Sequence, residues 1–132
     1  MASTVDEPVL TDDANEVTAR YVAAMNAGDV AAVLDLYTAD AVSIWEPGNP
    51  IHGAAHRAAV TEFLAGRPKM QATVRESYIT GDAALLVVDW TIDVTDEHGQ
   101  SERLSGTGLD VLRRGPDGKW RYAIDNPYGD VA

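Results

Sequence analysis

The first part of the chain carries apolar residues at helical spacing. They recur every three or four positions over residues 14–27, which predicts a helix with one side facing a core. Thr11 is the expected N-cap of this helix. Gly28 ends it, because glycine readily takes the left-handed conformation of a helix end, and Asp29 caps a second helix over residues 30–37.

A short apolar strand centred on Val42 follows, and a turn rich in proline and glycine leads into a third helix over residues 53–65. Strand alternation sends Trp45 to one face and Glu46 to the other, at the end of an apolar row. An ionised carboxylate on an apolar face is costly, so Glu46 is a candidate general base or acid. The alternative is that Glu46, at the strand end, reaches solvent and has no function.

From residue 70 onwards the apolar positions alternate with a period of two. The pattern predicts four strands joined by hairpin turns, over residues 70–80, 83–95, 101–114 and 119–126. Helices that precede an antiparallel meander make an α+β domain, with the helices on one face of the sheet. A curved sheet wrapped around three N-terminal helices encloses a cone-shaped space.

Composition limits the classes of function. The chain has 132 residues, which predicts one domain over residues 11–132 behind a flexible tail of residues 1–10. The formal net charge of −11 argues against nucleic acid and membrane surfaces as partners. Cysteine is absent, so thiolate chemistry is excluded. The N-terminus has no signal-peptide pattern and no apolar run approaches about 18 residues, so we expect a cytoplasmic protein.

Four segments carry a resemblance to a known superfamily: ARYVAAMNAGD, LYTADAVSIWEPG, IHG and VLRRGPDGKWRYAIDNPYG. The order of elements and these segments resemble the nuclear-transport-factor-two-like superfamily, within it the SnoaL-like and ketosteroid-isomerase-like proteins, from Asp12 to Gly129. The resemblance implies a cystatin-like fold. It says less about activity, because the superfamily includes isomerases, cyclases, dehydratases and binding proteins.

The resemblance to ketosteroid isomerases implies three catalytic positions. Tyr21 matches the tyrosine that donates to the developing oxyanion, and Glu46, just before a proline, matches the aspartate that acts as general base. Asp110 matches the second donor, a carboxylic acid kept protonated by apolar surroundings in ketosteroid isomerase itself. An outer-face, solvated Asp110 is the alternative. Glutamate is one methylene longer than the isomerase aspartate, and the third helix lacks the tyrosine that supports the oxyanion donor.

A second carboxylate is singled out by the SnoaL-like resemblance. SnoaL-like cyclases use a pocket aspartate as acid and base, and Asp125 is the counterpart. The alternative is that Asp125 and Asn126, which precede a proline, simply shape the strand end. Parity along this strand does not decide which face is inward.

Several aromatic and polar side chains are candidates to line a ligand pocket, although each is also an ordinary core or surface residue. They are Met25, Tyr37, Trp45, His52, Phe63, Trp90, Tyr122 and Asn126. His52 and His56 have the spacing of helical neighbours, but no third ligand lies near them in the sequence, so we expect no metal site. Neither a phosphate-binding loop nor a dinucleotide fingerprint is present, and we expect no cofactor.

Taken together, the sequence predicts an acid–base enzyme with an apolar pocket that acts on a small carbonyl compound by isomerase- or cyclase-type proton transfer. The alternative is a non-catalytic protein that binds a small hydrophobic molecule, or an accessory protein of a biosynthetic pathway. Either function is compatible with a homodimer through the outer face of the sheet, for which the candidate residues are Leu85, Val87, Leu109 and Val111.

Overall fold

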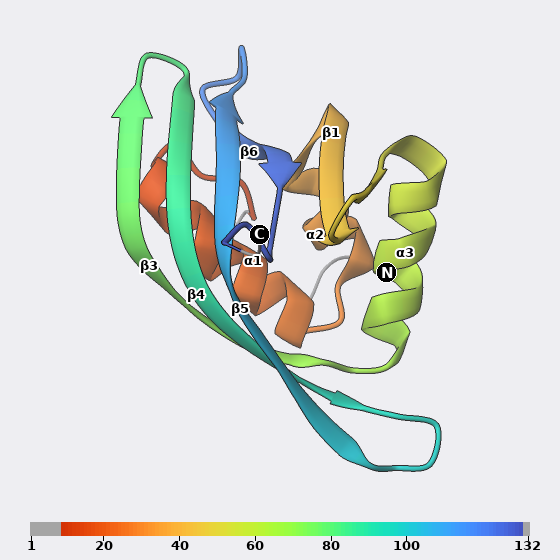
Figure 1. Ribbon diagram of the computed structural model, residues 1–132. Coiled ribbons are helices and arrows are strands. Elements are labelled where there is room, and N and C mark those ends of the chain that lie inside the picture. Colours follow the sequence, from red (N-terminus) through yellow and green to blue (C-terminus); the bar gives the residue numbers. More distant parts are fainter. Residues whose placement is uncertain (1–8, 131–132) are drawn as a thin grey trace.

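The computed structural model describes residues 9–130, so the first eight residues of the predicted tail lie outside it. Within the described residues, three helices and six strands follow a short 3-10 turn (Figure 1). Their bounds are η1 Ala14–Glu16, α1 Val17–Asn26, α2 Val30–Asp35, β1 Tyr37–Glu46, β2 Asn49–Ile51, α3 Gly53–Ala65, β3 Lys69–Thr80, β4 Ala83–Thr95, β5 Ser101–Arg114 and β6 Trp120–Asp125.

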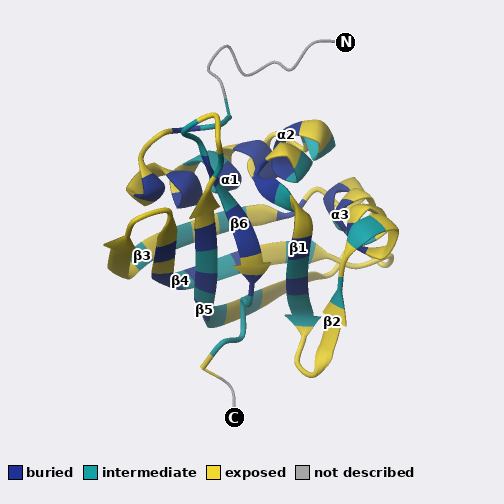
Figure 2. Cartoon of the chain, turned by 90° about the horizontal axis from the view of Figure 1, so that it is seen from above, coloured by how far each residue is buried: buried dark blue, intermediate teal, exposed yellow. Residues whose placement is uncertain are grey.

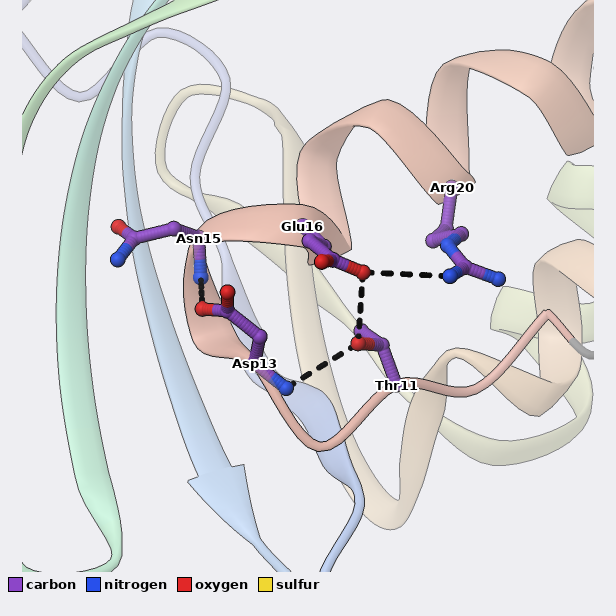
Figure 3. A network of polar contacts seen from close by, with 5 residues as sticks. All are labelled: Thr11, Asp13, Asn15, Glu16 and Arg20. Carbon is purple, nitrogen blue, oxygen red and sulfur yellow. Dashed lines mark hydrogen bonds and ion pairs between the residues drawn. The ribbon is translucent and has the colours of Figure 1, made fainter.

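The start of the first helix differs from the sequence prediction. Asp13, not Thr11, caps the 3-10 turn η1 that precedes α1, and its side chain accepts a hydrogen bond from the Asn15 amide at 2.9 Å. The Thr11 hydroxyl accepts from the Asp13 amide at 3.1 Å and donates to Glu16 at 3.1 Å (Figure 3). Glu16 also pairs with Arg20 at 3.2 Å. These contacts hold the chain in one 3-10 turn before α1 begins.

The second helix begins as predicted but ends earlier. Asp29 caps α2 by accepting from the Ala32 amide at 3.0 Å, and α2 ends at Asp35. The chain then becomes extended, because Tyr37 pairs with Tyr122 as the first residue of β1. Tyr37 is therefore a strand residue and not the last residue of a helix.

The six strands form one sheet in the order β2-β1-β6-β5-β4-β3. The predicted meander from β3 to β6 is confirmed, whereas β2 arises from residues expected to form only a turn. β1 lies parallel to β6, while the other neighbouring pairs are antiparallel. The sheet is curved and not closed into a barrel, since β2 and β3 are its two edges (Figure 1).

The core lies between the concave face of this sheet and the helices. Figure 2 shows buried and exposed bands alternating along the strands, which is the result of the period-two pattern. On β4 the buried row includes Leu86, Val88, Trp90 and Ile92, as predicted. The expected α+β architecture, with helices against one face of a curved sheet, is therefore confirmed.

One irregularity in β6 decides which of its side chains enter the core. Leu112 pairs with Tyr122, but Val111 pairs with Ile124, so Ala123 is an extra residue in β6. Such a bulge reverses the alternation beyond it. Tyr122 and Asp125 are consequently both buried, whereas Ile124 between them is 39% exposed.

Candidate active site

A cavity of about 250 Å³ lies between α1 and the concave face of the sheet. Eight of the residues singled out in the sequence line it: Tyr21, Met25, Trp45, Phe63, Trp90, Asp110, Tyr122 and Asp125. Seven further lining residues were not anticipated: Thr18, Met70, Val88, Ile92, Leu104, Pro127 and Tyr128. The wall is therefore mostly apolar, with two carboxyl groups and a few hydroxyls.

Asp110 is a buried acid on the inner face of β5. It is 7% exposed and lies opposite Leu86 on β4. The backbone amide of Asn126 donates to Asp110 Oδ1 at 3.2 Å. Burial, followed by the charge of neighbouring Asp125, raises the pKa of Asp110 well above its ordinary value of 3.8. These surroundings favour the protonated acid.

Asp125 has a different environment from Asp110, although both are buried. The Tyr37 hydroxyl donates to Asp125 Oδ2 at 2.6 Å, and Trp45 Nε1 donates to the same oxygen at 3.0 Å. Hydrogen bonds from such donors stabilise an ionised carboxylate. The two neighbouring acids therefore differ in their partners, because Asp125 accepts from two side chains and Asp110 from one backbone amide.

The phenols around the acids are held in the neutral form. Tyr21 and Tyr37 share a hydrogen bond of 2.9 Å between their hydroxyls. Burial first, and then the charge of Asp125, raises the pKa of both phenols well above 10.0. Burial also raises the pKa of Tyr122, with Asp110 and Asp125 adding to the effect. The tyrosines are thus hydrogen-bonding groups and not tyrosinates.

Thr18 contributes an unsatisfied hydroxyl to the cavity wall. The residue is 5% exposed, and its Oγ1 has no hydrogen-bond partner among the residues that the structure describes. Burial raises the pKa of the neighbouring Tyr122 phenol, and the proximity of Thr18 opposes that rise. Leaving a buried polar group unpaired costs about 1–3 kcal/mol.

Glu46 lies away from this cavity. Its side chain is exposed at the end of β1, and the residue pairs with Asn49 of β2. The physical reason is strand alternation, because Trp45 points toward the cavity and Glu46 therefore points to the other side. The apolar surroundings expected for Glu46 are absent, so the structure does not bring it together with Tyr21 and Asp110.

Three other candidates also stand outside the cavity wall. His52 is exposed just before α3. Tyr37 lies behind Asp125, and Asn126 acts through its backbone amide, which holds Asp110. Within residues 9–130, no three histidine or acidic side chains are grouped as a metal site.

His56 forms a separate buried contact behind the aromatic wall. Its Nε2 lies 3.0 Å from Ser43 Oγ, and its ring packs against that of Tyr37 with the centroids 4.3 Å apart. Burial lowers the pKa of His56 below its ordinary value of 6.5. The neutral imidazole therefore supports the position of Tyr37 and is not itself in the cavity wall.

Glycine at position 106 permits the close packing of one side of the cavity. A Cβ there would lie 3.0 Å from both the Pro127 oxygen and a ring carbon of Trp90. Trp90 Nε1 donates to that same Pro127 oxygen at 2.7 Å. Pro127 and Tyr128, beyond β6, complete the wall, and no periodicity in the sequence marks them.

The fold and the cavity define a curved-sheet α+β domain with a buried acid pair, and the comparisons with known proteins give its family. Residues 18–123 match the family model described as a SnoaL-like domain, so the chain belongs to the SnoaL-like family. No protein with a curated description matches the chain.

Solved structures support the same assignment. A conserved protein from Planctomyces limnophilus is 26% identical, with a TM-score of 0.75 over 82% of this chain and 86% of that one. A ketosteroid isomerase-like protein from Erwinia carotovora is 25% identical, with a TM-score of 0.66 over 80% and 84%. An NTF2-like protein from Salmonella enterica is 18% identical, with a TM-score of 0.70 over 85% and 84%. The predicted superfamily is confirmed.

The helices in the described part of the chain are short or polar. None of them combines the length and apolar character that crossing a membrane requires.

Proposed function

We propose that this protein is an acid–base enzyme that acts on a small, largely apolar carbonyl compound held in the cavity. The observation that carries the proposal is the proximity of Asp110 and Asp125 inside a mostly apolar wall. Two neighbouring carboxyl groups in different environments suit the roles of acid and base.

Each acid takes the role that its environment favours. Protonated Asp110 donates a hydrogen bond to the substrate carbonyl oxygen. Asp125 removes a proton from the carbon next to that carbonyl, and the electron pair of the broken C–H bond moves onto the oxygen to give an enolate. Return of the proton to the same or another carbon restores the carboxylate and completes an exchange or an isomerisation.

The relatives support this type of reaction by analogy. The Erwinia protein is described as ketosteroid isomerase-like, and its identity to this chain is 25%. Fold alone does not assign an activity, so the proposal depends on the acid pair. Glu46 has no part in the proposal, because its side chain is exposed on the other side of β1.

Deuterium exchange tests the proposal directly. The wild type is incubated in D₂O with a bicyclic ketone such as 2-tetralone, and incorporation next to the carbonyl is followed by NMR. Asp125→Asn is expected to slow the enzyme-dependent exchange by about 10²–10⁴-fold, and Asp110→Asn to slow it as well. Glu46→Gln should exchange at the wild-type rate. Ketones that bind without exchanging would favour the alternative, a non-catalytic binding protein.

We also propose that a second copy of this chain covers the outer face of the sheet. Tyr78, Leu85, Val111 and Ile124 lie opposite one another in a row from β3 to β6. Tyr78, Leu85 and Ile124 are 58%, 38% and 39% exposed. Contiguous exposed apolar residues usually mark an interface, and a two-fold axis brings the same row together from both copies.

A further inference from the structure

The hydrogen bonds at Asp125 have a fixed direction. Trp45 Nε1 and the Tyr37 hydroxyl both reach the same oxygen, Asp125 Oδ2, at 3.0 and 2.6 Å. An indole N–H can only donate. Oδ2 therefore accepts the Trp45 hydrogen bond, and it accepts that of Tyr37 as well when Asp125 is ionised or carries a proton on Oδ1.

The direction at Asp125 also sets the direction of the hydrogen bond between Tyr37 and Tyr21. The single hydroxyl proton of Tyr37 is engaged in the hydrogen bond to Asp125. In the 2.9 Å contact between the two phenols, Tyr21 must consequently be the donor. Tyr21 lines the cavity and Tyr37 does not. With its own proton engaged, Tyr21 offers the cavity only an acceptor oxygen.

Thr18 adds a second group with unused capacity. It precedes Tyr21 by three residues on α1, which places the two on the same side of the helix. Its buried Oγ1 lacks a partner among the described residues, and the residue lines the cavity. A ligand hydroxyl donates to one oxygen and accepts from another group, so it matches Tyr21 and Thr18 together. A carbonyl oxygen can only accept, so it would leave the acceptor oxygen of Tyr21 without a donor.

We propose that the cavity takes an apolar molecule bearing a hydroxyl group, which donates its hydrogen bond to Tyr21 and accepts one from Thr18. This inference specifies the ligand of the proposed function. It rests on that proposal only in assuming that the cavity is the ligand site. The substrate class becomes a hydroxylated carbonyl compound, with the carbonyl at Asp110. The role of Tyr21 is the reverse of the oxyanion donor implied by the ketosteroid isomerases.

A matched pair of probes tests the direction. 2-Naphthol can donate a hydrogen bond, whereas 2-methoxynaphthalene has the same rings and can only accept. Binding is measured by isothermal titration calorimetry at about pH 6, where the naphthol is protonated. The wild type is expected to bind 2-naphthol about tenfold more tightly. In Tyr21→Phe this preference should disappear, and Thr18→Val should reduce it.

Tyr37→Phe separates hydrogen-bond direction from a merely structural effect. Without Tyr37 the Tyr21 proton is released and can be donated to a ligand. The affinity of 2-methoxynaphthalene relative to 2-naphthol should then be higher than in the wild type. General damage to the cavity would weaken the binding of both probes alike. The methyl group of 2-methoxynaphthalene is present in every measurement with that probe, so its own contribution cancels when the affinity ratios of wild type and variants are compared.

The proposal is overturned by equal affinity of the two probes for the wild type, by a naphthol preference that survives in Tyr21→Phe, or by no binding of either probe. An unchanged ratio in Tyr37→Phe also contradicts it. The assay involves no turnover. A protein that prefers naphthol but exchanges no ketone proton would refute the catalytic role and leave the ligand class standing.

Discussion

The Tyr37 hydroxyl donates to Asp125 Oδ2 across 2.6 Å and so joins two residues that are 88 positions apart in the sequence. Tyr37 begins β1 and Asp125 ends β6, and these two strands lie side by side in parallel. The hydrogen bond therefore links the helical first half of the fold to the last strand of the meander. It contributes to the stability of the fold as well as to the site.

The first prediction concerns this bond. Tyr37→Phe should lower the free energy of unfolding by about 1.5–3 kcal/mol, because a buried carboxylate loses a donor. Urea denaturation followed by tryptophan fluorescence measures the change. Thr61→Val is the control, since the Thr61 hydroxyl donates to the Arg57 carbonyl at 2.9 Å on the exposed surface of α3 and should contribute little. Equal effects of the two substitutions would contradict the role given to Tyr37.

The second prediction concerns the pH dependence that Asp110 imposes. Its folded-state pKa lies well above the ordinary value of 3.8, so the folded protein binds more protons than the unfolded chain between those two values. The stability that Asp110 contributes is fully present below 3.8 and is lost as the pH rises through the raised pKa. Asp110→Asn should remove this decline. The stability of the variant relative to the wild type should therefore be greatest at neutral pH.

Denaturation midpoints of wild type and Asp110→Asn, measured at intervals from about pH 3 to pH 8, give the comparison. The surface acids are common to both proteins and cancel in the difference. Parallel curves over the whole range would mean that Asp110 is not protonated preferentially in the folded state.

The third prediction concerns Gly106. A methyl group there would lie 3.0 Å from both the Pro127 oxygen and the Trp90 ring, so one of them must move. Gly106→Ala should cost about 1–3 kcal/mol of stability and change the tryptophan emission. Gly66→Ala is the control, because its Cβ would meet only the Phe63 oxygen at 3.5 Å. A Gly106→Ala protein as stable as the control would show that this packing is loose.

The fourth prediction concerns the outer face of the sheet. Leu85→Lys places a charge in the middle of the apolar row formed by Tyr78, Leu85, Val111 and Ile124. Light scattering should show a dimer for the wild type and a monomer for the variant, because burying an unpaired ammonium group is costly. Gln100→Lys adds the same charge in the β4–β5 turn and should remain dimeric. A dilute wild-type monomer would refute the interface.

The sequence predicted most of the fold because its periodicity is regular. The bounds of α3, β4 and β5 agree with the structure, since each has a clear alternation or helical spacing between turn residues. The parallel pairing of β1 with β6 was not predictable in this way. It joins two strands that share no turn, and β2 is three residues of a turn that pair with β1.

The candidate site was predicted only in part, and the reason differs for each carboxylate. Alternation already separated Trp45 from Glu46, yet the match to an isomerase motif favoured Glu46. Asp110 was a candidate through its match to the isomerase donor, and the structure places it at the inner face of β5, where it is 7% exposed. Asp125 did not follow from parity, because the bulge at Ala123 is defined by the register of the neighbouring strand. Thr18, one helical turn before Tyr21, was detectable from spacing.

The polar and the apolar parts of the cavity wall come from different parts of the sheet. The acid pair, the side chains that bond to it and the two groups assigned to the ligand lie on α1, β1, β5 and β6. The apolar wall residues on β3, β4 and the first half of β5 are Met70, Val88, Trp90, Ile92 and Leu104. Substitutions in this second set change the shape of the cavity without touching the acid pair. Selection for a new ligand can therefore act on one half of the wall while the chemistry of the other half is inherited unchanged.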